Sequence, residues 1–227
     1  MSENKSKVNI IYQIYFDDSS RDKINEKSEG LFNQNLTVFF ENLVISEWFR
    51  NNEHYLKDID YLGFLSYNFE HKNNKEIPFN EIEKLNYDIY LLGGKSVFNH
   101  NLVLFGKTSH GKYFDLLFKE MCRDVLGLNS LDLDLINMGV YQNAVVCKTE
   151  IYKKYIDECL NPCIDWCVNY RYKDILFSEC NYNGGLDSRN LLIKTGFPYY
   201  TFHTFILERL WSVFIHLNEG KFNIKRF

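Results

Sequence analysis

Residues 57–69 read Lys-Asp-Ile-Asp-Tyr-Leu-Gly-Phe-Leu-Ser-Tyr-Asn-Phe. The uncharged, mostly apolar run at 61–65 is typical of a strand that is buried on both faces of a largely parallel sheet. Open α/β sheets bind ligands just beyond the carboxyl ends of such strands. We therefore expect Ser66 and Asn68 to face a ligand, although Ser-Tyr-Asn also fits a simple turn into the polar segment that follows.

Strand-like and helix-like segments alternate along the chain on both sides of this run. The expected strands cover residues 8–16, 57–69, 87–92 and 138–146. The expected helices cover residues 31–49, 79–85, 111–125, 151–160, 163–172 and 202–217, the last one amphipathic. This βαβ rhythm predicts an α/β fold with a mainly parallel, Rossmann-like sheet flanked by helices, in one domain over residues 1–227.

The composition narrows the function classes. The chain carries 26 Lys and Arg against 30 Asp and Glu, a formal net charge of -4, and the basic residues form no stripe. Sequence-independent binding to nucleic acid is therefore disfavoured. No apolar run approaches the roughly 20 residues that span a bilayer, and residues 1–7 lack the apolar region of a signal peptide. We expect no transmembrane segment and a cytoplasmic protein, with the inner face of a membrane as an alternative setting.

The six cysteines lack the paired C-x-x-C spacing of a zinc ribbon, which favours a reducing compartment. Cys159, Cys163 and Cys167 recur every four residues and would share one face of a helix. We favour a packed stripe over a metal site, because we expect Pro162 to interrupt the helix and no His accompanies the three thiols.

Three stretches resemble capsular-polysaccharide and lipopolysaccharide glycosyltransferase-like domains of the GT-A class. Residues 60–69 are similar to that family's Asp-Tyr-Val-Gly-Leu-Cys-His-Tyr-Arg-Arg-Tyr-Phe segment, and residues 141–152 resemble its Tyr-Asn-Met-Phe-Ile-Met-Lys-Lys-Glu-Ile-Phe segment. Residues 202–210 resemble its Gly-Phe-Leu-Ser-Glu-Arg-Leu-Phe ending. Asn-Met-Gly-Val at 137–140 is similar to the Asn-Ser-Gly-Val run of glycogenin-like enzymes. Small virus-encoded GT-A domains have a comparable length.

The resemblance implies a nucleotide-sugar-dependent hexosyltransferase that acts in polysaccharide or glycoconjugate synthesis. Its donor would be a nucleoside diphosphate sugar, with a UDP-sugar as the expected one, and its acceptor a glycan. Tyr15, Asp17 and Asp18 follow or end the first strand, where they could hold the nucleoside, but a plain turn explains Asp-Asp-Ser-Ser as well. For the donor, the resemblance adds Asn137, Gly139 and Arg209.

An inverting transfer needs a carboxylate base. Our candidates, in falling order, are Glu208, Asp187 and Asp134. The alternative for the adjacent Glu208 and Arg209 is a structural ion pair in an apolar helix.

One departure from the family concerns the metal. In most GT-A enzymes the strand equivalent to residues 61–65 ends in Asp-x-Asp, whose carboxylates hold a divalent cation, but here Ser66-Tyr67-Asn68 takes that place. Hard cations prefer carboxylate oxygens, so a manganese or magnesium cofactor stays open. His203 is a candidate metal ligand, and the alternative is a helix cap or a partly buried histidine.

Two other classes of function stay open. A catalytically degenerate GT-A fold could act as a sugar- or protein-binding module. A phosphate-ester hydrolase would need clustered carboxylates or a Cys/Arg phosphate loop after a strand, and neither is evident in the sequence.

Overall fold

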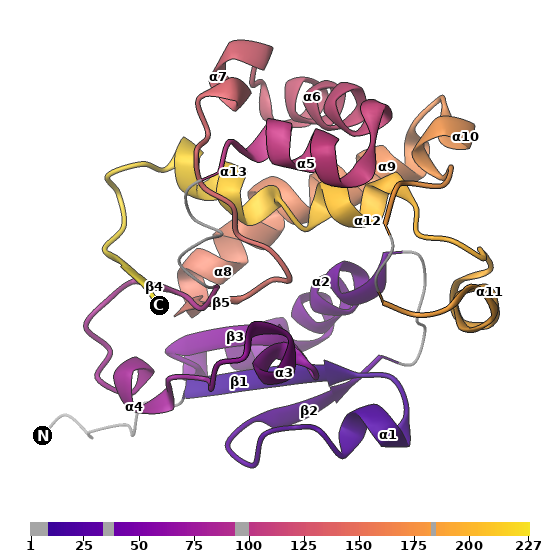
Figure 1. The fold of residues 1–227 in the computed structure, drawn as a ribbon. Coiled ribbons are helices and arrows are strands. Elements are labelled where there is room, and N and C mark those ends of the chain that lie inside the picture. The colour runs from indigo at the N-terminus through magenta and orange to yellow at the C-terminus, as the bar shows by residue number, and fades with distance from the viewer. Residues whose placement is uncertain (1–8, 34–38, 94–99, 183–184) are drawn as a thin grey trace, which may run out of the picture.

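The computed structural model describes residues 9–33, 39–93, 100–182 and 185–227 as a mixed α/β fold (Figure 1). Within these ranges six strands form one sheet in the order β2-β1-β3-β5-β4-β6. The strands are β1 Asn9–Tyr15, β2 Glu29–Phe32, β3 Tyr61–Ser66, β4 Ile89–Leu91, β5 Val145–Lys148 and β6 Ile224–Arg226. Neighbouring strands run parallel except around β5, which is antiparallel to β3 and to β4. The sheet is therefore mixed and mostly parallel.

Helices flank the sheet, as the βαβ rhythm predicts. The α-helices are α1 Asp18–Arg21, α2 Phe40–Asn52, α3 Phe69–Asn73, α4 Phe79–Ile82, α5 Leu102–His110, α6 Lys112–Leu126, α7 Ser130–Asp134, α8 Thr149–Tyr155, α9 Asn161–Asn169, α10 Lys173–Leu176, α11 Ser188–Thr195, α12 Phe202–Leu207 and α13 Leu210–Leu217. A 3-10 helix, η1, covers Glu53–Asp58, and a π-helical stretch, η3, covers Ile156–Leu160. No helix in the described ranges combines the length and the apolar character that crossing a bilayer requires.

Strand β3 occupies the centre of the fold, and all six of its residues are buried. It pairs in parallel with β1, so that Ile14 lies opposite Ser66 at the carboxyl ends of the two strands. Gly63 is needed within β3, because a Cβ atom there would lie 2.6 Å from the Val146 side chain on β5. The apolar run of the sequence thus forms the buried strand that it predicts.

Two apolar clusters cover the two faces of the sheet. The larger one packs one face against α2, α8, α12 and α13, with α5, α6 and α9 stacked beyond them (Figure 1). The smaller one covers the other face with residues of α3, α4 and their connection, such as Phe69, Ile77 and Ile82. The deep layer of helices therefore lies on one side of the sheet only.

Three predicted elements differ in the structure. The helix expected over 31–49 begins only at Phe40, because residues 29–32 pair with β1 as β2; residues 34–38 lie outside the described ranges. The strand expected over 138–146 begins only at Val145, because Gln142 and Asn143 have φ angles of 58° and 51° that no strand accommodates. The single amphipathic helix expected over 202–217 is two helices, α12 and α13, that are buried at nearly every position.

Pro162 does not interrupt its helix as predicted. Helix α8, η3 and α9 follow one another without a gap over 149–169, and Pro162 lies in the first turn of α9. The wider π-helical turns directly before it accommodate a residue that lacks an N–H group. Cys159, Cys163 and Cys167 are buried free thiols, and burial raises the pKa of each of them. The packed stripe is therefore confirmed.

The prediction of one domain over residues 1–227 stays a prediction. The described elements share one sheet and its two apolar clusters. Residues 1–7, in which the sequence predicts no leader, lie outside the described ranges.

Candidate active site

A small pocket lies where β1 and β3 end side by side. The Tyr67 backbone N–H, just past β3, donates to the Ile14 carbonyl at 3.0 Å and joins the two strand ends. Asp17, just past β1, lines this pocket of about 190 Å³ together with Tyr67. The complete lining is Phe16, Asp17, Ser19, Ser20, Lys23, Tyr67, Leu186, Asn190 and Lys194. The pocket therefore lies at the carboxyl edge that the sequence predicts for a ligand.

Asp17 is held in place as the N-cap of α1. Its carboxylate accepts a hydrogen bond from the Ser20 backbone N–H at 2.8 Å and lies 3.3 Å from the Lys194 ammonium of α11. Burial opposes its ionisation, but the bonds from Ser20 and the charge of Lys194 lower its pKa below the usual value. Asp17 is therefore ionised at neutral pH and can accept hydrogen bonds from ligand hydroxyls.

Aromatic rings form the rest of the pocket wall. The rings of Phe16 and Tyr67 meet edge to face with centroids 5.3 Å apart. The Lys194 ammonium lies 3.8 Å from the Phe16 ring centroid, and the Lys23 ammonium lies 5.6 Å from that of Tyr67. A ligand with a flat ring and polar edges suits this pocket wall. The aromatic side chains can stack on the ligand ring, and the flanking ammonium groups can donate hydrogen bonds to its edges.

Glu208 lies at the break between α12 and α13 and is partly buried. Burial raises its pKa from 4.5 to about 7, and repulsion from Glu41 adds to this rise, whereas the charges of Arg209 and Lys72 lower the pKa. Because α12 ends before it, Glu208 belongs to a turn between two buried helices. A carboxyl group with this pKa exchanges protons near neutral pH, as a general base must.

Glu41, in the first turn of α2, is a second carboxylate of the site, and the sequence analysis missed it. It hydrogen-bonds the Ser66 side chain at the end of β3, and burial raises its pKa. Phe40 directly before it has a φ of 47°, a strained conformation for a bulky residue, and stacks on Tyr200 with centroids 5.6 Å apart. Strained backbone is concentrated at functional sites. In the sequence, Glu41 looks like an ordinary acidic residue in the first turn of a helix. The positive φ of Phe40, which only the structure shows, distinguishes it.

Arg209 is 1% exposed and directly follows Glu208. Its guanidinium lies between two rings, 4.6 Å from the centroid of Phe114 and 4.9 Å from that of Tyr141, and it donates to the Phe205 carbonyl. Among the residues that the structure describes, its Nε has no hydrogen-bond partner. Among the described residues no carboxylate lies within 4.0 Å of it, so the adjacent Glu208 and Arg209 form no structural ion pair.

Gly139 leaves room for the Tyr141 ring that packs on Arg209. A Cβ atom at position 139 would lie 2.5 Å from the Tyr141 hydroxyl oxygen, so only glycine lets the Tyr141 ring lie where it meets Arg209. The Val140 backbone N–H donates to the Ser212 hydroxyl of α13 at 2.8 Å and fixes the loop before β5. The loop that contains Gly139 thus positions one of the two rings around Arg209.

Comparisons with family models, with curated proteins and with solved structures find no match. The function is therefore inferred from the chemistry of these residues and from the resemblance of the sequence.

His203 lies in the core and is 0% exposed. Its Nδ1 shares a hydrogen bond with the Thr201 hydroxyl at 3.0 Å, and its ring contacts those of Phe39 and Phe177 with centroids 4.7 and 4.5 Å away. In the part of the chain that the structure describes, no group of three or more His, Cys, Asp or Glu side chains is arranged to hold a metal ion. His203 thus has the surroundings of a packed histidine.

Four other candidates for donor binding do not line the pocket. Ser66 and Asn68 lie at its edge of the sheet, but Ser66 is buried against Glu41 and Asn68 precedes α3. Asp18 is exposed in α1, and the Tyr15 ring packs on Phe32 with centroids 5.2 Å apart. Sequence position placed these residues at the correct edge but gave no side-chain direction.

The last three candidates have local structural roles. Asp187 caps α11, and hydrogen bonds from Asn190, which lines the pocket, lower its pKa. Asp134 pairs with Lys119 at 3.1 Å on α7, across the helical layer from the sheet (Figure 1). Asn137 is exposed and donates to the Leu135 carbonyl at 3.2 Å. Burial raises the pKa of Glu208, whereas Asp187 is a helix cap with a lowered pKa and Asp134 is an exposed partner of Lys119, so Glu208 is the best-placed base.

Proposed function

We propose that the chain is a hexosyltransferase of the GT-A type that transfers a sugar from a nucleoside diphosphate sugar to a glycan in polysaccharide or glycoconjugate synthesis. We place this reaction in the cytoplasm or at the inner face of a membrane. The observation that carries the proposal is Glu208, a carboxyl group with a pKa of about 7 that adjoins Glu41, Lys72 and Arg209. The ordered resemblance of three sequence segments supports the same class.

Glu208 is the proposed base. The acceptor hydroxyl gives its proton to the Glu208 carboxylate while its oxygen forms a bond to the anomeric carbon of the donor. The bond between that carbon and the diphosphate oxygen breaks, and its electron pair leaves with the nucleoside diphosphate. A base is most effective when its pKa lies near the working pH, which the burial of Glu208 provides.

The pocket around Asp17 is the proposed nucleoside site. Its carboxylate can accept hydrogen bonds from ribose hydroxyls, and the rings of Phe16 and Tyr67 can flank a base. The volume of about 190 Å³ favours a small pyrimidine, in keeping with a UDP-sugar donor.

Cations of the chain are proposed to balance the diphosphate. Lys72 acts electrostatically on both Glu41 and Glu208, and the unpartnered Nε of Arg209 provides a buried donor next to them. Preorganised donors of this kind stabilise a leaving group as its charge develops. The described residues do not fit a manganese or magnesium ion held by the protein alone, so such an ion would take most of its ligands from the diphosphate.

One observation favours the second candidate, a binding module without turnover. Arg209 is 1% exposed and enclosed by Phe114 and Tyr141, so a substrate reaches it only after the side chains rearrange. A catalytically inactive GT-A fold would keep the aromatic pocket as a binding site, and no substrate would have to reach Arg209.

The test combines binding with turnover. Purified protein is screened by thermal shift against UDP-, GDP- and dTDP-sugars with and without manganese, and release of the nucleoside diphosphate is measured with mixed glycan acceptors. A ligand at 100 times its Kd stabilises the fold by ~2.7 kcal/mol, which raises Tm measurably.

We expect stabilisation by UDP compounds and turnover that Glu208→Gln reduces roughly 10²–10⁴-fold. Glu150→Gln, at an exposed acid in the first turn of α8, is the matched control. Binding without turnover would select the binding module. A protein that no nucleotide sugar stabilises would contradict the glycosyltransferase and favour a module that binds a glycan or a protein.

A further inference from the structure

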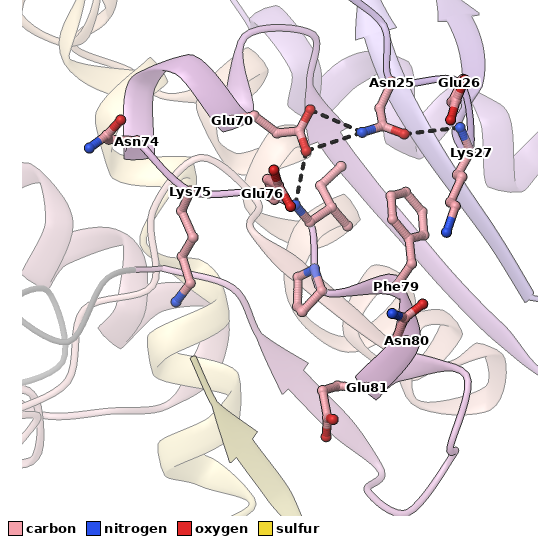
Figure 2. Close-up of a pocket in the computed structure, with 12 residues that line it drawn as sticks. Asn25, Glu26, Lys27, Glu70, Asn74, Lys75, Glu76, Phe79, Asn80 and Glu81 are labelled. Atoms are coloured by element: carbon pink, nitrogen blue, oxygen red, sulfur yellow. Dashed lines mark hydrogen bonds between the residues drawn. The ribbon is translucent and has the colours of Figure 1, made fainter.

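A second, larger hollow adjoins the nucleoside pocket. It measures about 1080 Å³ and lies between the turn before β2 and the segment from α3 to α4 (Figure 2). Lys23 and Tyr67 line the small pocket, and Asn25 and Glu70, two and three residues further along the same segments, line the groove. The groove therefore lies along the same two chain segments as the small pocket.

The groove lining is polar and bears a single aromatic ring. It consists of Asn25, Asn74 and Asn80, of Glu26, Glu70, Glu76 and Glu81, of Lys27 and Lys75, and of Ile77, Pro78 and Phe79. Four carboxylates against two ammonium groups disfavour a phosphorylated or sulfated ligand. Amides and carboxylates at the same surface can donate to and accept from many hydroxyls, and the Phe79 ring can stack on the apolar face of a sugar.

Glu70 joins the two walls of the groove (Figure 2). Its carboxylate accepts from the Asn25 side-chain amide at 3.1 Å and from the Ile77 backbone N–H at 2.9 Å. The Asn25 backbone N–H donates in turn to the buried Gln13 side chain at 2.6 Å. The shape of the groove is therefore fixed before any ligand arrives, which lowers the cost of binding.

Other side chains of the lining keep their hydrogen-bonding groups for a ligand. The side chains of Asn74, Glu76 and Asn80 make no hydrogen bond or ion pair with any described residue. Figure 2 shows Asn74, Glu76 and Asn80 along the segment from α3 to α4, with Asn80 beside Phe79. A ligand that lies along this wall of the groove would thus meet several polar groups.

We propose that this groove binds a neutral oligosaccharide, as the site for the remote units of the glycan acceptor. The inference deepens the proposed function and rests on it, because it names the class of acceptor. A volume at the upper end of the roughly 300–1,000 Å³ of small-molecule sites exceeds what one sugar unit needs. A peptide is the poorer fit, because peptide grooves rely on apolar side-chain pockets or on a free strand edge.

The groove also has a hydrogen-bonded connection to the candidate active site. Gln13, which accepts from Asn25, donates its side-chain N–H to the Ser66 carbonyl at 3.4 Å. The Ser66 side chain in turn acts on Glu41 by lowering its pKa. One buried glutamine thus joins the wall of the groove to the end of β3.

The test measures oligosaccharide binding directly, in the absence of a sugar donor and without any turnover. Amide shifts of ¹⁵N-labelled protein are followed by NMR during titration with cellotetraose, maltotetraose and chitotetraose, and, in a second arm, with an uncharged six-residue peptide. We expect at least one oligosaccharide to shift the amides of residues 25–27, 74–77 and 79–81 together. No shift in these segments with any of the three, or a larger response to the peptide, would overturn the proposal.

Variants with matched controls sharpen the result. Phe79→Leu and Asn80→Ala should each weaken oligosaccharide binding roughly threefold to tenfold. Phe105→Leu on α5 and Asn51→Ala on α2, both at exposed positions outside the groove, should leave it unchanged. Equal weakening by the controls would contradict the assignment.

Nucleotide binding is measured in parallel by thermal shift. UDP stabilisation without oligosaccharide shifts would reject only the groove. Oligosaccharide shifts without any nucleotide binding would retain the groove and reject the glycosyltransferase.

Discussion

The raised pKa of Glu208 makes a prediction that needs no knowledge of the substrate. Its pKa rises from 4.5 to about 7 in the fold, chiefly through burial. The fold therefore binds more protons than the unfolded chain between these two pH values. Stability from this group is complete below pH 4.5 and is lost as pH rises through about 7. A pKa difference of ~2.5, at ~1.4 kcal/mol for each pKa unit, makes the whole of this loss roughly 3–4 kcal/mol.

Glu208→Gln removes the charge and keeps the shape. We expect the free energy of unfolding of the variant, relative to the wild type, to increase by ~3 kcal/mol between pH 4.5 and pH 8. Urea unfolding at several pH values measures it, and Glu150→Gln, at an exposed acid, should show no such difference. Parallel stability curves for wild type and Glu208→Gln would refute the raised pKa and with it the role of Glu208 as a base. If turnover is found, kcat/KM of the wild type should rise with pH through an apparent pKa of about 7.

Three further outcomes follow from the site. Glu41→Gln removes a repulsion and should lower the pKa of Glu208, seen as a shift of its carboxyl ¹³C titration to lower pH. An unchanged titration would show that the charge of Glu41 does not act on Glu208. Asp17→Asn should weaken UDP binding roughly three- to twentyfold with little change in Tm. Asp18→Asn, at the exposed neighbouring position, is the control and should leave UDP binding unchanged. Equal effects of the two variants in calorimetry would show that the nucleoside binds outside this pocket. Excess chelator should reduce turnover only in part, because the described residues form no metal-binding cluster; complete loss of turnover in chelator, restored by manganese, would contradict this expectation.

The main strands could be predicted because their signal is local. Residues 61–65 are apolar and uncharged, and the structure buries all of β3. Strand β2 escaped prediction, since Glu29, Gly30 and Phe32 are exposed on a short edge strand without an alternating pattern. Helix α5 was missed for a different reason. Its Gly106 lowers helix propensity but allows contact with Phe114, where a Cβ would lie 2.1 Å from the ring.

The site could be predicted only as far as strand order fixes it. The parallel pairing of β1 and β3 brings Asp17 and Ser66 to one edge, as expected. The partners of Glu208 and Arg209 come from α2, α3, α6 and the loop before β5, at separations that no local pattern encodes. The buried surroundings of Glu41 and His203 are tertiary properties as well, which explains why the sequence did not single out Glu41 and left His203 between a metal ligand and a partly buried histidine.

The reversed direction of β5 has a consequence for how this protein could diversify. Its neighbours β3 and β4 finish at the ligand edge, but β5 starts there, so the chain that carries Gly139 and Tyr141 enters the sheet at this edge instead of leaving it. The opposite end of β5 is anchored separately by the Lys148–Asp88 ion pair at 2.6 Å. Because the far end of β5 fixes the strand register, substitutions in the loop before it can change the surroundings of Arg209 through Tyr141 without shifting the strand. Such substitutions offer a route to new donors, both for natural descendants and for design.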